Sequence, residues 1–168
     1  KFMYAIQRDG SSDNDWTPYV QDVVDLSGDY QTYAVDFQMQ SATDIKSILT
    51  FSMGAVGGTR IQTQHRICID NIVLEKIDAP EQEPEKPAVT PVEAGVEILK
   101  NADFADGTNH WNSSISESGA AEVAVSGNAI LYDITSAGTK DYSIKLEQAG
   151  LQLEQGCTYE VKFDVTSS

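Results

Sequence analysis

The sequence predicts an all-β protein, and two observations support this fold class. Apolar and polar residues alternate in many short segments, which are separated by turns rich in Gly, Ser, Asp and Asn. A period of two is the pattern of a β-strand with one buried face. The chain shows no amphipathic segment of three helical turns. Many short strands at this spacing are typical of a β-sandwich or a β-barrel.

Five strands are expected in the first half, at residues 2–7, 20–26, 30–39, 48–53 and 66–75. One face of the third strand is expected to carry Tyr33, Val35, Phe37 and Met39. In the fifth strand, Ile67, Ile69 and Val73 are expected to share a face. A polar loop at 10–15 and a glycine-rich turn at 54–58 interrupt the pattern.

The composition changes sharply at residues 79–95. Four of the five prolines fall here, among four glutamates. Because proline fixes φ and lacks a backbone donor, this stretch favours extended chain over helix or sheet. We therefore expect a linker at 79–95 between two halves, residues 1–78 and residues 96–168.

Four further strands are expected in the second half, at residues 121–125, 129–134, 142–146 and 158–165. One face of the last strand is expected to carry Tyr159, Val161, Phe163 and Val165. A loop at 101–109 precedes Trp111, and 150–156 is expected to be a turn region. Neither half alone should bury a full core, so the folded unit must pair the halves within one chain or between two chains.

Length and charge narrow the class of protein. The chain has 168 residues, 40% of them hydrophobic, and a formal net charge of −15. This suits one packed domain and argues against nucleic acid, whose phosphates require Lys and Arg. No apolar run reaches the roughly 18 residues of a membrane span. Because Lys1 is not an initiator, we expect a piece of a longer protein. Cys68 and Cys157 fit either two buried thiols or one bridge between the halves.

Enzyme chemistry finds little support in the sequence. His65 and His110 lack the spacing of metal ligands, and no nucleophile elbow, Walker loop or Rossmann glycine pattern occurs. Acidic residues are plentiful, but a glycosidase needs two carboxylates held at a set separation. We therefore expect a binding or structural protein rather than an enzyme.

Three segments resemble the jelly-roll carbohydrate-binding modules of families 4, 9, 16 and 22. Asn101-Ala102-Asp103-Phe104, followed by Gly107 and Trp111, resembles their opening motif. Tyr142 to Leu146 and Gly156 to Phe163 resemble their midpoint, and Phe51 to Gly54 and Ile67 to Leu74 resemble their ending. The order is permuted: residues 1–78 resemble the C-terminal half of a module, and residues 96–168 resemble the N-terminal half.

The resemblance implies a jelly-roll β-sandwich of two antiparallel sheets, assembled from both halves within one chain or as a domain-swapped dimer. Joining Ser168 to Lys1 would then connect two adjacent strands around a missing turn. The implied function is non-catalytic binding of a plant cell-wall polysaccharide, xylan first and β-glucan second, for an attached bacterial glycoside hydrolase such as a xylanase. The protein would be secreted or on the cell surface. The alternatives are a structural β-sandwich spacer or interaction module without a sugar ligand, and a hydrolase with an acidic pair.

Aromatic residues beside polar loops are the first candidates for sugar binding, because a pyranose ring stacks on an aromatic face. Trp16 and Tyr19 follow the polar loop, and the resemblance places a stacking aromatic near Trp16. Tyr142 stands where the family often has a sugar-stacking Trp. Each could instead anchor a loop or fill the core. The resemblance implies that Trp111 packs the sandwich.

Planar polar side chains that could bind sugar hydroxyls form a second set. The candidates are Gln7, Arg8, Asn112, Arg60, Gln62 and Gln64. Gln62 and Gln64 alternate on an expected strand at 61–66, and their face could equally be plain solvent surface. Ser52 stands where the family sometimes has a ligand-binding His.

The resemblance also implies a structural calcium ion where the ends of the module meet. Asp70 matches the family's side-chain ligand, and Asn101 and Asp103 lie in the matching opening loop. Calcium requires several oxygen ligands, including backbone carbonyls. The family's acidic residue after the Phe is Ala105 here, which is a departure from the pattern. Alternatively, Asp70 caps a strand end.

Overall fold

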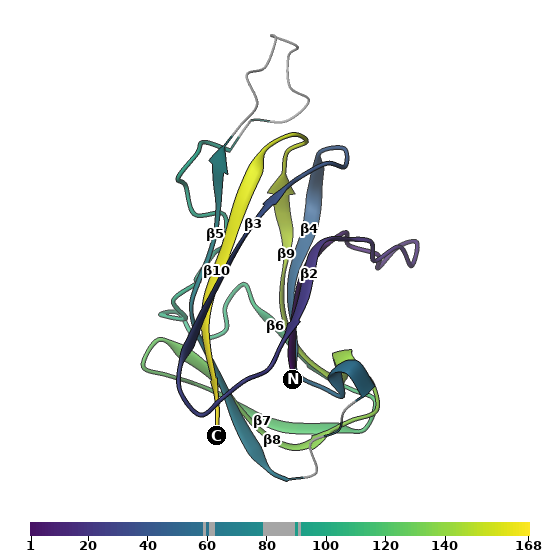
Figure 1. Cartoon of the computed structure of the whole chain (residues 1–168), viewed down its shortest axis with the longest axis vertical. Helices are drawn as coiled ribbons and strands as arrows, with labels where there is room; N and C mark the ends of the chain where they lie inside the picture. Colours follow the sequence, from purple (N-terminus) through teal and green to yellow (C-terminus); the bar gives the residue numbers. More distant parts are fainter. Residues whose placement is uncertain (59, 61–62, 79–89, 91) are drawn as a thin grey trace.

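The computed structural model describes residues 1–58, 60, 63–78, 90 and 92–168, and the fold is all-β (Figure 1). The strands are β1 (Phe2–Gln7), β2 (Pro18–Val24), β3 (Gln31–Gln38), β4 (Asp44–Ser52), β5 (His65–Asp78), β6 (Asn112–Ile115), β7 (Gly119–Ser126), β8 (Ala129–Ala137), β9 (Ile144–Leu153) and β10 (Thr158–Ser167). Two short 3₁₀ turns are η1 (Val56–Gly58) and η2 (Asp141–Ser143). The prediction of an all-β fold is confirmed.

The strands form two antiparallel five-stranded sheets, and each sheet contains strands from both halves of the chain. Sheet A has the order β2-β1-β4-β9-β6, and sheet B has the order β3-β10-β5-β8-β7. In sheet B, β10 of the second half lies between β3 and β5 of the first half. The two sheets pack as a β-sandwich (Figure 1). One chain therefore assembles a sandwich from both halves, as predicted.

The core joins the halves most tightly around Phe163 of β10. Its ring centre lies 4.9 Å from that of Phe51, 5.2 Å from that of Tyr4 and 5.8 Å from that of Phe2. Phe163 is fully buried, and its aromatic neighbours all come from the first half. Tyr159, Val161 and Val165 are buried on the same face, as the alternation predicted. Since buried aromatic area dominates core energetics, the pairing of the halves contributes much of the stability of this core.

One face assignment was wrong, because β5 contains a bulge at Asn71. Asn71 has a φ of 49°, and the ladder with β10 shifts register between Lys162 and Asp164. The extra residue reverses the alternation, so Ile69 and Ile72 are both buried in the core. Val73 therefore lies on the opposite face from Ile69 rather than beside it.

Several element boundaries also differ from the prediction. Thr63 and Gln64 lie outside any strand, because β5 begins at His65. Tyr142 belongs to η2 rather than to β9. The expected turn at 150–156 is shorter, because β9 continues to Leu153 while it pairs with β4. The short polar strand β6 was not predicted, since N-S-S-I carries no alternating apolar pattern.

The strands at the two termini are not hydrogen-bonded neighbours, which corrects the expected join. β1 lies in sheet A and β10 lies in sheet B, so they face each other across the core. The two termini lie toward the same end of the sandwich (Figure 1). The interpretation of the halves as parts of successive modules stays a prediction, and most of the expected linker lies outside the described residues.

The two cysteines are free and buried, so they form no bridge between the halves. The hydroxyl of Tyr30 lies 2.7 Å from Cys68 Sγ. The structural role expected for Trp111 agrees with its position: it is buried, its ring centre is 5.5 Å from that of Phe104, and Nε1 donates to the Asn101 carbonyl. In the part of the chain that the structure describes, no helix has the length and apolarity needed to cross a membrane.

Candidate functional site

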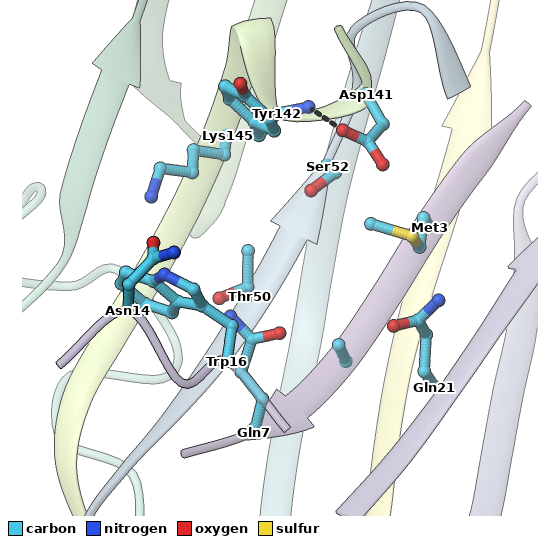
Figure 2. A pocket seen from close by; sticks show the side chains of 11 residues that line it. Met3, Gln7, Asn14, Trp16, Gln21, Thr50, Ser52, Asp141, Tyr142 and Lys145 are labelled. Atoms are coloured by element: carbon cyan, nitrogen blue, oxygen red, sulfur yellow. Dashed lines mark hydrogen bonds between the residues drawn. The ribbon is translucent and has the colours of Figure 1, made fainter. Parts of the chain in front are cut away.

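A groove of about 570 Å³ lies on the outer face of sheet A (Figure 2). Its floor comes from the outward-facing residues of β1, β2, β4 and β9, and its walls come from the β1–β2 loop and from η2. The lining residues are Met3, Ala5, Gln7, Asn14, Trp16, Gln21, Thr50, Ser52, Asp141, Tyr142 and Lys145. Leu49 and Phe51 of β4 point the other way, into the core.

The floor of the groove lies below its walls because several floor residues have small side chains that adjoin one another across neighbouring strands. Ala5 of β1 lies opposite Thr50 of β4 and opposite Gln21 of β2. One row further along, Ser52 lies opposite Met3 and Lys145. Since side chains of paired residues stand side by side on one face, the small residues leave a hollow between taller walls.

The wall formed by Trp16 depends on a tightly held loop. Arg8 bridges the loop through Asp13 at 2.6 Å and Asp15 at 2.7 Å. The hydrogen bond from the Thr17 hydroxyl, with the charge of Arg8 nearby, lowers the pKa of Asp15. Gly10 is required under the indole, because a Cβ there would lie 2.8 Å from Trp16 Cδ2. The Trp16 side chain is 39% exposed and faces the groove.

The wall formed by Tyr142 is positioned by a glycine from the first half. Gly54 donates its N–H to the Asp141 carbonyl at 2.9 Å, and a Cβ on Gly54 would lie 2.3 Å from the Lys140 carbonyl oxygen. The Ser143 hydroxyl accepts the N–H of Lys140 at 2.9 Å and closes the turn. Tyr142 is left 46% exposed at the groove. Gly54, the last residue of the Phe51 to Gly54 segment, thus permits the close approach of the two backbones that positions Tyr142.

Lys145 is the cation of the groove, and it is paired on both sides. Its Nζ lies 2.6 Å from Glu147 Oε2 and 5.9 Å from the centre of the Trp16 ring. Glu147 also accepts a hydrogen bond from Asn112 Nδ2 at 2.9 Å. Asn112, a predicted ligand residue, therefore lies outside the groove and contributes to the ion pair that holds Lys145.

Tyr19 does not line the groove. It is half-buried against the core, and its hydroxyl donates to Asp44 Oδ2 at 2.8 Å. Burial, with the hydrogen bond to Asp44, raises the pKa of Tyr19 to about 12. These contacts make Tyr19 a packing residue of sheet A.

The remaining hydrogen-bonding candidates are scattered. Gln7 lines the groove, whereas Arg8 is engaged by the aspartates of the Trp16 loop. Arg60 borders a separate hollow of about 190 Å³ beside the β7–β8 hairpin and the segment after β8. Gln64 is exposed and lines neither hollow. Gln62 lies outside the described residues.

Sequence reasoning missed several groove residues, namely Met3, Ala5, Asn14, Gln21, Thr50, Asp141 and Lys145. Met3 and Ala5 occur in an apolar strand and were indistinguishable from core residues. A signal did exist: in β4, polar Thr50 and Ser52 alternate with core residues Leu49 and Phe51. Period-two alternation places such residues on the outer face, but it does not say which strands meet there.

The residues proposed for calcium make contacts within their own segments. Asp70 lies within β5 rather than at a strand end, and Oδ1 accepts the Asn71 N–H at 2.7 Å. Asn101 Oδ1 accepts the Asp106 N–H at 2.9 Å, and Asp103 Oδ1 accepts the Ala105 N–H at 3.2 Å.

Among the described residues, no group of three or more His, Cys, Asp or Glu side chains is arranged to hold a metal ion. Calcium also accepts amide and backbone carbonyl oxygens as ligands, so the calcium site stays a prediction.

The groove combines two exposed aromatic rings with the amide side chains of Gln7, Asn14 and Gln21. Aromatic faces offer apolar platforms, and amides both donate and accept hydrogen bonds. This chemistry suits a neutral ligand with apolar ring faces and many hydroxyl groups. The fold and the groove together define a β-sandwich with a groove on the outer face of sheet A.

Residues 96–168 match the family model described as "Carbohydrate binding domain". The resemblance drawn from the motifs is therefore confirmed for this part of the chain, which supplies Tyr142 and Lys145 to the groove. Comparisons with curated proteins and with solved structures gave no match. Carbohydrate-binding modules are non-catalytic, so the family match agrees with the expectation that this is not an enzyme.

Proposed function

We propose that this chain binds a plant cell-wall polysaccharide in the groove of sheet A, xylan first and β-glucan second, and thereby targets an attached bacterial glycoside hydrolase such as a xylanase. The protein acts outside the cell or on its surface. The observation that supports this proposal is that Trp16 and Tyr142 are both exposed and line one groove. A spacer without a ligand would be expected to bury two such rings, because exposed apolar surface costs free energy.

The experiment is affinity gel electrophoresis in native gels that contain xylan, β-glucan or mannan. We expect retardation by xylan above all, with β-glucan second and mannan last. Migration that none of the three polysaccharides changes would support the spacer instead. Release of reducing sugar from any of them would support a hydrolase.

Two further features belong to this proposal. The halves represent the end of one module and the start of the next, and exchange of halves between two chains would give a dimer with the same sandwich. Light scattering separates a monomer closed on itself from such a dimer. A calcium ion that involves Asp70, Asn101 and Asp103 would pin the ends of the module.

A further inference from the structure

Residues 92–100, called the strap below, connect β5 of sheet B with β9 of sheet A. On the β5 side, Gly95 donates its N–H to the Lys76 carbonyl at 2.9 Å. On the β9 side, Gln148 Oε1 accepts the Lys100 N–H at 2.7 Å, and Gln148 Nε2 donates to the Lys100 carbonyl at 2.9 Å. The strap therefore joins a strand of the first half to a strand of the second half.

The strap continues the edges of both sheets where their short strands end. β8 pairs with residues 65–69 of β5, and β6 pairs with residues 144–147 of β9. Further along β5, a bridge between Glu75 and Glu97 places the strap beside this strand. Leu99 of the strap is 6% exposed and belongs to the core. Detachment of the strap would therefore expose apolar core surface.

An ion pair between the halves lies where the strap begins. Lys76 Nζ is 3.4 Å from Glu154 Oε2, and these two residues are 5% and 8% exposed. They are the only buried Lys and Glu among the residues that the structure describes. Glu154 Oε1 accepts the N–H of Val92, the first residue of the strap, at 2.6 Å. One carboxylate thus holds both the end of the first half and the start of the strap.

A buried ion pair has a particular energetic consequence. Removal of one partner leaves an uncompensated charge away from water and is strongly unfavourable, whereas removal of both partners is often nearly neutral. The closed strap is the arrangement in which Lys76 and Glu154 are both paired. Arg66 and Asp133 also pair between the halves, at 2.7 Å, but their side chains are 53% and 34% exposed. Such an exposed pair contributes little.

We infer that Lys76 and Glu154 form a latch that keeps the strap closed against β5 and β9, and that loss of either charge opens the strap while the two sheets stay folded. The strap and the latch lie outside the groove of sheet A. Exchange of halves between two chains, which rests on the proposed function, requires this contact to break and to form again. The latch would therefore control how readily exchange begins.

Trypsin cleavage after Lys100 reports the open strap. The Lys100 residue is exposed, but Gln148 holds its N–H and its carbonyl, so a protease cannot bind this backbone until the strap detaches. Cleavage from a transiently opened form follows the population of that form. Lys162 lies in β10, between β3 and β5, so cleavage after Lys162 reports unfolding of the sandwich itself. Lys86 precedes Pro87 and is not a trypsin site.

Three variants of the full chain test the latch. Glu154→Gln keeps an oxygen for the Val92 N–H but leaves Lys76 without its anion, and Lys76→Met leaves Glu154 without its cation. Each should raise the rate of cleavage after Lys100 about tenfold or more, with no matching rise after Lys162. The double variant Lys76→Met/Glu154→Gln buries no charge, so its rate should return to within about threefold of the wild type.

Asp133→Asn is the matched control, because it breaks the exposed pair between the halves, and its rate should stay within about twofold of the wild type. The measurement is mass spectrometry of the fragments during a time course of limited digestion. Wild-type rates in both single variants would overturn the inference, as would a double variant cleaved as fast as the single ones. An equal rise after Lys162 would also overturn it, since the whole sandwich would then have loosened. The digestion contains no polysaccharide, so failure of sugar binding would not change its result, and light scattering tests the exchange of halves separately.

Discussion

The ammonium group of Lys145 lies 5.9 Å from the centre of the Trp16 ring, across the boundary between the two halves of the chain. Trp16 belongs to the loop after β1, and Lys145 belongs to β9. A cation over an aromatic face is attracted by the ring, by about 0.5–1 kcal/mol at an exposed site. The groove is thus shaped where the halves meet, and its shape depends on their pairing.

Removal of either exposed ring should weaken binding without unfolding the protein. Each aromatic platform should contribute on the order of 1–3 kcal/mol through stacking. Trp16→Ala and Tyr142→Ala should therefore reduce retardation in a polysaccharide gel at least severalfold. Tyr30→Ala is the control, since Tyr30 is 55% exposed but contacts Cys68 on sheet B. Equal retardation of all three variants and the wild type would contradict the groove assignment.

Neither half should fold when it is produced alone. β10 needs β3 and β5 on its two sides, and Phe163 packs against aromatic rings from the first half only. We expect residues 1–78 and residues 96–168 to melt without a cooperative transition by themselves and to regain one when mixed. Circular dichroism of the separate and mixed fragments measures this. A cooperative transition in either isolated fragment would show that the halves are independent units.

Gly54→Ala should lower both stability and binding. A Cβ at this position would meet the Lys140 carbonyl oxygen at 2.3 Å, so the η2 turn and Tyr142 must move away. Such strain costs about 1–3 kcal/mol and should appear as a lower melting temperature and weaker retardation. Gly28→Ala is the matched control, because the nearest atom to its added Cβ lies at 3.6 Å. Normal behaviour of Gly54→Ala would mean that the turn tolerates displacement.

The protein should lose stability in alkali through Tyr132. Burial raises the pKa of Tyr132 to about 12, and its hydroxyl donates to Ser113. Because this folded pKa exceeds the unfolded value near 10, the unfolded chain loses the proton first. The contribution of Tyr132 is complete below pH 10 and is lost as the pH rises through 12.

Urea unfolding at pH 9 and at pH 11.5 tests the effect of Tyr132. The free energy of unfolding should fall by about 2 kcal/mol through this residue alone. In Tyr132→Phe the fall should be smaller by that amount, and what is left would come from other tyrosines whose pKa is raised, such as Tyr19. The same pH dependence in both proteins would contradict the assignment to Tyr132.

Calcium should raise the melting temperature if the proposed ion is bound. A cation bound only by the folded form stabilises it by about 2.7 kcal/mol at a hundredfold excess over the dissociation constant. Melting in millimolar calcium and in EDTA should therefore differ for the wild type but not for Asp70→Ala. Glu122→Ala, which removes an exposed carboxylate of β7, should keep the difference. Identical wild-type curves in the two buffers would argue against calcium, with Ala105 in place of an acidic residue as the reason.

The local alternation of apolar and polar residues was sufficient to predict most of the strands and most of the strand faces that pack in the core. The alternation around Phe163 predicted a fully buried face, because period two follows from strand geometry alone. The face predicted around Phe37 is buried at Phe37 and Met39 and half-buried at Tyr33 and Val35. The alternation failed at Asn71, where a single bulged residue reverses the faces of β5. It also failed for β6, whose position depends on pairing with β9 rather than on its own residues.

The sequence by itself determined the all-β class, the need to pair the two halves, and the two aromatic residues that now line one groove. Only the tertiary structure decided that Thr50 lies on the groove floor, that Arg8 holds a loop, and that Tyr19 packs against the core. The reason is physical. Alternation says that a side chain points outward, but the register of β1, β4 and β9 and the close approach at Gly54 decide which outward side chains meet.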